Sequence, residues 1–200
     1  MTKLVFSLLA AALVVVGAQA IIKEQCSWII GKHPFDEERI SGLWHVIAVA
    51  KNAPEQEPKT CAQYNVTYDK SNGDEKYIVK FTALDKEKKM VSFEGISKPR
   101  KSDRRSMFLG VMKKTGSETY DGIYNEAIVA TDYDTYAVYV GCKPIFDSTT
   151  NEFGRRFVAA VLSRRPTLNE DIKNTLINVL SGYDIEPTNF KTVEHVDCPQ

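Results

Sequence analysis

The stretch Thr131–Val138, which reads TDYDTYAV, decides the fold of this chain. Two segments rich in β-branched and aromatic residues, which favour strands, overlap the two ends of this stretch. The first segment is Ile123–Thr131 and the second is Thr135–Cys142. We therefore predict two successive antiparallel strands joined by a tight turn.

Six further segments read as strands, and turn signals such as Ser71–Gly73 separate them. They are Gly42–Lys51, Cys61–Asp69, Tyr77–Leu84, Met90–Ile96, Ser106–Lys113 and Arg156–Ser163. Eight short strands at this spacing predict an antiparallel barrel or sandwich over residues 42–163.

One helix is predicted after the strands, over residues 168–181. Thr167 and Glu170 have the spacing of a capping box, directly after Pro166, and Gly182 is a stop signal. The apolar stripe of this helix is Ile172, Leu176, Val179 and Leu180. Because the outside of the barrel is the only large surface for that stripe, we expect the helix to pack there.

The amino terminus has the pattern of a cleaved signal peptide over residues 1–20. Lys3 precedes the apolar run Leu4–Val16, and Ala18–Ala20 is a small-x-small cleavage site. We expect a secreted, extracellular chain that begins at Ile21 and has no membrane span; the alternative is an uncleaved anchor.

The remaining chain, residues 21–200, suits a single domain with a sizeable core. The whole sequence has 26 basic and 26 acidic residues. This balance gives no general attraction to nucleic acid or anionic membranes.

The four cysteines imply two disulfides, because their number is even and the chain is expected to be secreted. They are Cys26, Cys61, Cys142 and Cys198, and spacing alone leaves three pairings open. The sequence contains no C-x-x-C spacing, so it does not indicate zinc or redox chemistry. His33, His45 and His195 are scattered, so no metal site is predicted, and His45 is expected to face outward.

Period-two alternation assigns faces to the better strands. Asn65 begins a glycosylation sequon and should point outward, so its neighbours should point inward. The same reasoning places Ala50 inside with Trp44. The predicted ligand-lining residues are Val46, Ala48, Tyr64, Val66, Tyr68, Val79, Phe81 and Phe93. On alternation alone, an ordinary packed core is the simpler explanation.

Three patches in order resemble the motifs of the lipocalins. They are Gly42-x-Trp44, Thr131-Asp132-Tyr133 and Arg164. The resemblance implies an eight-stranded antiparallel up-and-down barrel whose interior holds one small apolar ligand. It also implies that Trp44 plugs the closed end with Arg164 over its ring, as a structural rather than catalytic pair.

Within this family, the chain is most similar to apolipoprotein D and the insect bilin-binding proteins. The similar residues are Trp44-His45, Cys61 with Asn65, and the ending Val193–Pro199. This likeness implies disulfides Cys26–Cys142 and Cys61–Cys198, which tie both tails to the barrel. Ala127 and Ala160 stand where this group often has aromatics, so no relative's ligand is transferred.

The resemblance implies a non-enzymatic carrier or storage protein that requires no cofactor. The ligand classes it suggests are a bilin, a carotenoid, a retinoid and a fatty acid. The alternative is a secreted interaction or scavenger protein with a filled barrel. A synthase role would need a free cavity thiol. Ligand identity, tissue, a cell-surface receptor and homo-oligomerisation are left open by the sequence.

The stretch Lys98–Arg105 contains five basic residues and one acidic residue. One interpretation is a solvated loop. The other, which places the stretch near the open end, is an entrance that attracts carboxylates.

Overall fold

The computed structural model describes residues 25–52, 59–101 and 104–199. The predicted signal peptide therefore lies outside the described residues. The strands are β1 (Gly42–Lys51), β2 (Thr60–Asp69), β3 (Lys76–Leu84), β4 (Met90–Pro99), β5 (Met107–Lys114), β6 (Tyr124–Thr131), β7 (Tyr136–Asp147), β8 (Glu152–Ser163) and β9 (Lys191–Thr192). The helix is α2 (Glu170–Leu180), and short 3₁₀ turns are η1 (Ser71–Gly73), η2 (Ser181–Tyr183) and η3 (Pro187–Asn189).

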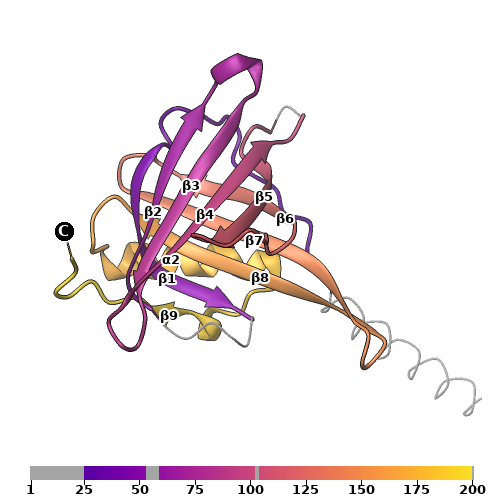
Figure 1. Cartoon of the computed structure of the whole chain (residues 1–200). Helices are drawn as coiled ribbons and strands as arrows, with labels where there is room; N and C mark the ends of the chain where they lie inside the picture. Colours follow the sequence, from indigo (N-terminus) through magenta and orange to yellow (C-terminus); the bar gives the residue numbers. More distant parts are fainter. Residues whose placement is uncertain (1–24, 53–58, 102–103, 200) are drawn as a thin grey trace, which may run out of the picture.

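The eight main strands form a closed antiparallel barrel (Figure 1). Each strand from β2 to β7 pairs with the next one along the chain, and β1 pairs with both β8 and β2. This topology confirms the predicted up-and-down barrel. The β2–β3 turn lies at the top of Figure 1 and the β3–β4 loop at the bottom, so these mark the two ends of the barrel.

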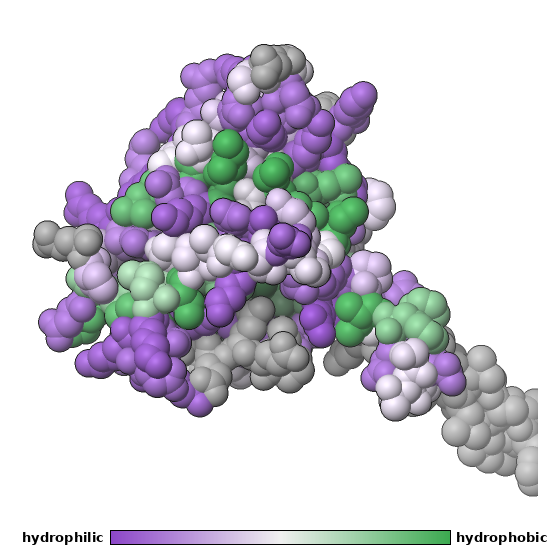
Figure 2. Space-filling view, in the orientation of Figure 1, coloured by the Kyte–Doolittle hydropathy of each residue, from purple (hydrophilic) through white to green (hydrophobic). Residues whose placement is uncertain are grey.

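The β7–β8 hairpin is longer than the sequence predicts and projects from the barrel (Figure 1). Its pairing continues to Asp147 and Glu152. Phe146 and Phe153 pack against each other with ring centroids 4.9 Å apart, although both are mostly exposed. Figure 2 shows the hydrophobic surface that this projecting hairpin presents.

A β-bulge in β1 overturns one sequence prediction. The register of β1 on β8 shifts between Val46 and Ala48. Ala48 and Ala50 therefore pack outside the barrel, and Val49 instead joins the cluster inside it. The carbonyl of Ile47, at the bulge, accepts a hydrogen bond from the Val193 backbone N–H at 2.9 Å. Thus the carboxy-terminal tail, which β9 pairs along β1, stabilises the irregularity.

Helix α2 begins differently from the prediction. Its N-cap is Asn169, whose side chain accepts hydrogen bonds from the backbone N–H groups of Asp171 and Ile172. The predicted Thr167–Glu170 capping box is therefore wrong. The short amide side chain of Asn169 already satisfies the first free N–H groups of the helix.

The buried face of α2 is also rotated from the predicted stripe. Lys173, Leu176, Ile177 and Leu180 are buried, whereas Ile172 and Val179 are exposed. The apolar members of that face pack on the outside of the barrel against β7, β8 and β1, as expected. The amine of Lys173 reaches Glu170 at 2.7 Å, so only the aliphatic stem is covered.

Two disulfides tie the tails to the barrel. Cys26 is bonded to Cys142 on β7, and Cys61 at the start of β2 is bonded to Cys198. This is the pairing that the resemblance implies. Within the described part of the chain, no helix is long and apolar enough to cross a membrane.

Candidate ligand-binding barrel

The closed end is built around a buried tryptophan. Trp44 is 1% exposed, and its indole N–H donates to the carbonyl of Ile40 at 2.7 Å. The guanidinium carbon of Arg164 lies 3.6 Å from the centre of the Trp44 ring. This cation–π contact is the arrangement that the motifs imply.

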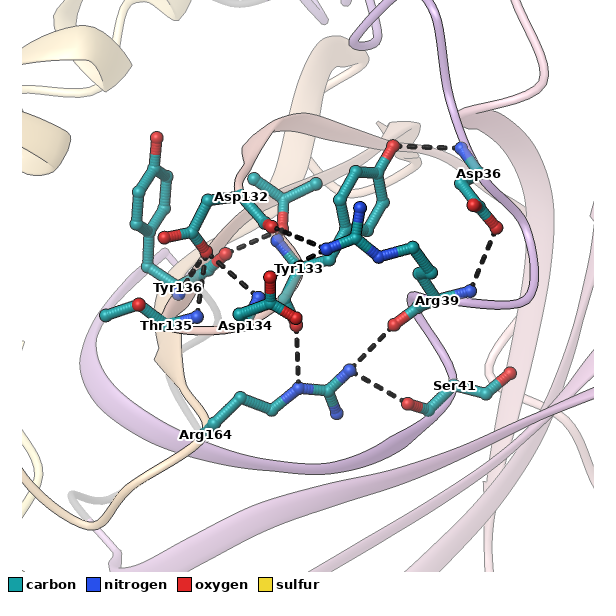
Figure 3. Close-up of polar contacts among 10 residues, drawn as sticks. Asp36, Arg39, Ser41, Asp132, Tyr133, Asp134, Thr135, Tyr136 and Arg164 are labelled. Carbon is teal, nitrogen blue, oxygen red and sulfur yellow. Dashed lines mark hydrogen bonds and ion pairs between the residues drawn. The ribbon is translucent and has the colours of Figure 1, made fainter.

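Arg164 also joins three segments through backbone carbonyls (Figure 3). It donates to Tyr133 at 3.0 Å, Leu43 at 3.0 Å, Arg39 at 2.8 Å and Ser41 at 2.9 Å. A Cβ added at Gly42, where φ is +101°, would lie 3.1 Å from the same guanidinium. Gly42 therefore suits both the backbone conformation and the close approach of Arg164.

The β6–β7 turn is held by its own first residues. One carboxylate oxygen of Asp132 accepts from the backbone N–H groups of Asp134, Thr135 and Tyr136 (Figure 3). The Thr131 hydroxyl donates to the backbone carbonyl of Tyr136 and accepts from the backbone N–H of Tyr133. Burial opposes ionisation of Asp132, but these N–H groups outweigh it and hold the pKa of the carboxyl below its usual range. These motif residues therefore make a self-satisfied structural turn.

The basic stretch Lys98–Arg105 lies at this closed end, not at the open end. Strand β4 begins at the β3–β4 loop and runs to the opposite end of the barrel. The connection from β4 to β5 therefore lies at the closed end. Arg105 forms ion pairs with Glu37 and Glu75. The interpretation of this stretch as a ligand entrance is therefore wrong, because its topology and its carboxylate partners assign it to the base of the barrel.

The other predicted ligand-lining residues face the interior. Every one except Ala48 either belongs to the inner cluster or packs against a member of it; they are Val46, Tyr64, Val66, Tyr68, Val79, Phe81 and Phe93. Tyr68 lies at the closed end, where its ring stacks on Tyr77 and its hydroxyl contacts Arg105. Its hydroxyl is therefore directed at the base rather than into the lumen.

Aromatic rings form one continuous wall from the open end into the barrel. The Lys59 amine lies 5.2 Å from the centre of the Phe93 ring, and Phe93 lies 6.1 Å from Phe81. Phe81 in turn lies 4.9 Å from Tyr64, and Tyr64 lies 6.4 Å from Tyr139. Neighbouring strands β2, β3 and β4 thus contribute one wall of aromatic rings that leads inward, and Tyr139 on β7 meets it from across the barrel.

A carboxyl group stands at the inner end of this wall. The Glu126 side chain accepts hydrogen bonds from the hydroxyl of Tyr139 at 2.9 Å and from the hydroxyl of Ser97 at 2.7 Å. A Cβ added at Gly110 would lie 2.1 Å from the carboxyl, so this glycine makes room for it. Burial raises the pKa of Glu126, and the two hydroxyl donors only partly offset this effect.

Sequence reasoning missed Glu126. It lies on β6, where Ala127 packs outside the barrel and Ile128 packs inside, so both faces of the strand are apolar. Because polar and apolar residues do not alternate along this strand, the side to which the Glu126 side chain points could not be assigned from the sequence. The available signal was a charged residue within a predicted strand, directly before the apolar run Ala127–Ala130.

The hydroxyl of Tyr64 has no hydrogen-bond partner among the described residues. Burial raises the pKa of Tyr64 strongly, and the neighbouring Glu126 carboxyl adds to the effect. Among the described residues, the side-chain atoms that lack both contact with solvent and a hydrogen-bond partner are His45 Nδ1 and the Tyr77 hydroxyl. The Tyr64 hydroxyl is not one of them. It therefore faces accessible space.

Inward-facing side chains at this depth keep accessible surface. Tyr64, Glu126 and Tyr139 lie deep in the protein, yet each keeps part of its surface accessible. Phe81 and Val79, on the same inner surface, are also only partly buried. Accessible surface on enclosed inward-facing side chains must border internal space, which a tightly packed core does not leave.

Lysines surround the open end. Lys51 ends β1, Lys59 precedes β2 and Lys114 ends β5. Burial and the positive charge of Lys59 lower the pKa of Lys51 to about 8. Burial also lowers the pKa of Lys59, where Asp85 opposes the effect and Lys114 reinforces it. The mouth is therefore a site of concentrated positive charge.

The remaining candidate groups lie outside the barrel. His45 faces outward, as expected, and packs edge-on against His195 at 5.2 Å. Burial, followed by the charge of His195, lowers the pKa of His45. All four cysteines are in disulfides, and no group of metal-ligating side chains occurs among the residues that the structure describes.

Solved structures share this architecture at low sequence identity. Insecticyanin from the tobacco hornworm Manduca sexta has a TM-score of 0.65 and 18% identity, covering 87% of this chain and 88% of that chain. H1 crustacyanin from the lobster Homarus americanus has a TM-score of 0.63 and 17% identity, covering 88% and 91%. The cockroach allergen Per a 4 has a TM-score of 0.57 and 19% identity, covering 88% and 98%.

No protein-family model matches the chain, and no curated protein matches it by sequence. At these identities, the structural likeness speaks to the fold. The closed eight-stranded barrel, the helix packed on its outside and the Trp44–Arg164 base agree with it. The chain therefore has the lipocalin fold that its sequence motifs predict.

Proposed function

We propose that this protein is a carrier or storage protein that holds one small apolar or amphipathic molecule inside its barrel. The observation that carries the proposal is that inward-facing aromatic and aliphatic side chains deep in the barrel keep accessible surface. Burial of ligand against such walls contributes ~25 cal/mol per Å² of apolar surface. A bilin, a carotenoid, a retinoid or a fatty acid has the required chemistry.

The mouth favours a ligand with an acidic head group. Lys51 and Lys59 lack an ion-pair partner among the described residues, and the charge of Lys59 disfavours protonation of Lys51. An incoming carboxylate would relieve that repulsion. This role replaces the one considered for Lys98–Arg105 at the other end.

A secreted, extracellular location fits the same proposal. Two disulfides, each closing more than 100 residues, persist in oxidising compartments. Asn65 is exposed on β2, where a glycan would extend into solvent.

Fluorescence titration tests the proposal directly. Trp28 is 80% exposed and Trp44 is 1% exposed, so a Trp28→Phe background leaves one tryptophan at the base of the lumen. Biliverdin, retinoic acid, a carotenoid and a long-chain fatty acid would be titrated in turn. We expect at least one to bind with one-to-one stoichiometry and a negative heat-capacity change.

A matched pair of variants locates the binding. Phe81→Asp places a charge in the lumen, whereas Lys80→Asp changes the exposed neighbour on the same strand. The first should weaken binding far more than the second. If none of the four ligands binds better than about micromolar, and delipidated protein shows no internal cavity, the filled-barrel interaction protein replaces the carrier.

A further inference from the structure

We propose that the Glu126 carboxyl and the Tyr64 hydroxyl form a polar anchor, deep in the lumen, for a hydroxyl group at the buried end of the ligand. This inference rests on the proposed function and defines its ligand class. The ligand would be an elongated amphipathic acid with its carboxylate at the lysine mouth and its hydroxyl at the anchor.

The first argument is the incomplete pairing of the two groups. Glu126 accepts from Ser97 and Tyr139 but has no ion-pair partner in the described chain. The Tyr64 ring lies 6.4 Å from the ring of Tyr139, whose hydroxyl donates to Glu126 at 2.9 Å, and the Tyr64 hydroxyl has no hydrogen-bond partner among the described residues. Buried polar groups are normally satisfied, so unpaired ones beside internal space mark a place for a ligand or water.

The second argument is the chemistry that would satisfy both groups. A hydroxyl can donate to a Glu126 oxygen and accept from the Tyr64 hydroxyl at once. A carbonyl accepts only, so it could pair with the Tyr64 hydroxyl but would give the Glu126 oxygens no further donor. A cationic amine would have to pass the mouth, where Lys59 already disfavours protonation of Lys51 and Lys114 that of Lys59.

The third argument is the continuity of the wall between the two polar ends. Lys59, Phe93, Phe81 and Tyr64 follow one another inward at centroid distances of 5.2, 6.1 and 4.9 Å. An alkyl or polyene chain laid along these rings would join a carboxylate at the mouth to a hydroxyl at the anchor.

The test compares ω-hydroxy fatty acids with unsubstituted acids of the same chain lengths, by Trp44 fluorescence in the Trp28→Phe background. We expect the hydroxy acid of best-fitting length to bind about tenfold to a hundredfold tighter, because a site built to pair a hydroxyl rejects an analogue without it. Tyr64→Phe and Glu126→Leu should each remove most of that preference.

Two controls separate binding from stability. Tyr64→Phe deletes an unpartnered hydroxyl, so the melting temperature of the ligand-free protein should not fall, whereas a structural hydroxyl would lower it. Tyr68→Phe, whose hydroxyl contacts Arg105 and Glu75 at the closed end, should leave the preference intact.

The outcomes are distinct. Equal binding of both acids, unaffected by Tyr64→Phe, would overturn the anchor and leave the carrier function standing. Tighter binding of an ω-amino acid than of the hydroxy acid would overturn it in favour of a cation site at Glu126. Binding of neither acid, nor of the four ligands named above, would overturn the anchor and the carrier function together.

Discussion

The closed end and the deep lumen of the barrel both contain polar side chains, but they differ in how completely those groups are paired. At the closed end, Arg164 donates to four carbonyls and Asp132 accepts from three N–H groups. In the lumen, Tyr64 has no partner among the described residues and Glu126 has hydroxyl partners only. Groups satisfied by the fold stabilise it, whereas enclosed unsatisfied groups are available to a ligand.

Removal of the tryptophan ring should have the largest effect on stability. Trp44→Ala deletes a fully buried aromatic group beside Arg164, and such truncations cost ~3–5 kcal/mol in the free energy of unfolding. Chemical denaturation measures this. Trp28→Ala, at an exposed site, should change stability by less than ~0.5 kcal/mol. Similar losses at both positions would contradict the closed-end plug.

Loss of the Arg164 guanidinium should have the second-largest effect on stability. Arg164→Ala removes the cation–π contact and leaves backbone carbonyls unpaired, for which we expect about 2–3 kcal/mol. Because Arg164 contacts Trp44, the double variant should deviate from additivity by at least ~0.5 kcal/mol. Arg164→Lys should recover little, since an ammonium cannot reach the same set of acceptors. Simple additivity would show that the two side chains stabilise the base independently.

The turn carboxylate should contribute less, and its contribution should depend on pH. Asp132→Ala should cost about 1–2 kcal/mol at neutral pH, as for other carboxylates that accept backbone N–H groups. Since folding lowers the pKa of Asp132, its stabilisation is present above the unfolded pKa of ~3.9 and is lost as the pH falls through the folded pKa.

Unfolding curves of wild type and Asp132→Ala should therefore converge in acid. Asp134→Ala is the control, because the exposed Arg39–Asp134 pair should be worth less than ~1 kcal/mol. A pH-independent difference between wild type and Asp132→Ala would refute the assigned role of the carboxylate.

Glu126→Gln should have the smallest effect and the opposite pH dependence. Burial raises the pKa of Glu126, so its contribution is fully present below the unfolded pKa of ~4.3 and is lost as the pH rises through the folded pKa. The phenols that interact with this carboxyl are Tyr64, Tyr124 and Tyr139, and burial raises the pKa of each. None of them titrates in that window.

The variant should therefore be at least as stable as wild type at neutral pH, with a flatter stability profile above the unfolded pKa. The measurement is the melting temperature of ligand-free protein across this range. If Glu126→Gln melted well below wild type at neutral pH, the carboxylate would have a structural role like that of Asp132.

The closed end was predictable because several of its residues act locally, and because its motifs resemble those of the lipocalins, which implied the long-range contact of Arg164 with Trp44. Asp132 accepts from groups two to four residues later in the chain. Trp44 bonds to Ile40, four residues earlier, and Gly42 is required by its own backbone angle. Contacts over such short separations leave a readable pattern in the sequence.

The interior was predictable only where strands alternate regularly. Alternation placed Tyr64, Val79 and Phe81 correctly, because the opposite face of β2 and β3 meets solvent. It failed at Ala48, because the bulge in β1 depends on a bond from Val193, which lies far along the chain. It also gave no direction for Glu126, whose strand is covered on both faces.

By itself, the sequence predicted the strands and their order from periodicity and turns, and its lipocalin-like motifs implied the barrel and the tryptophan-plugged base. Only the tertiary structure decided which polar groups are paired. Glu126 on β6 takes its donors from Ser97 on β4 and Tyr139 on β7, while Tyr64 on β2 finds none among the described residues. Pairing is a property of distant segments brought together, so no local pattern records it.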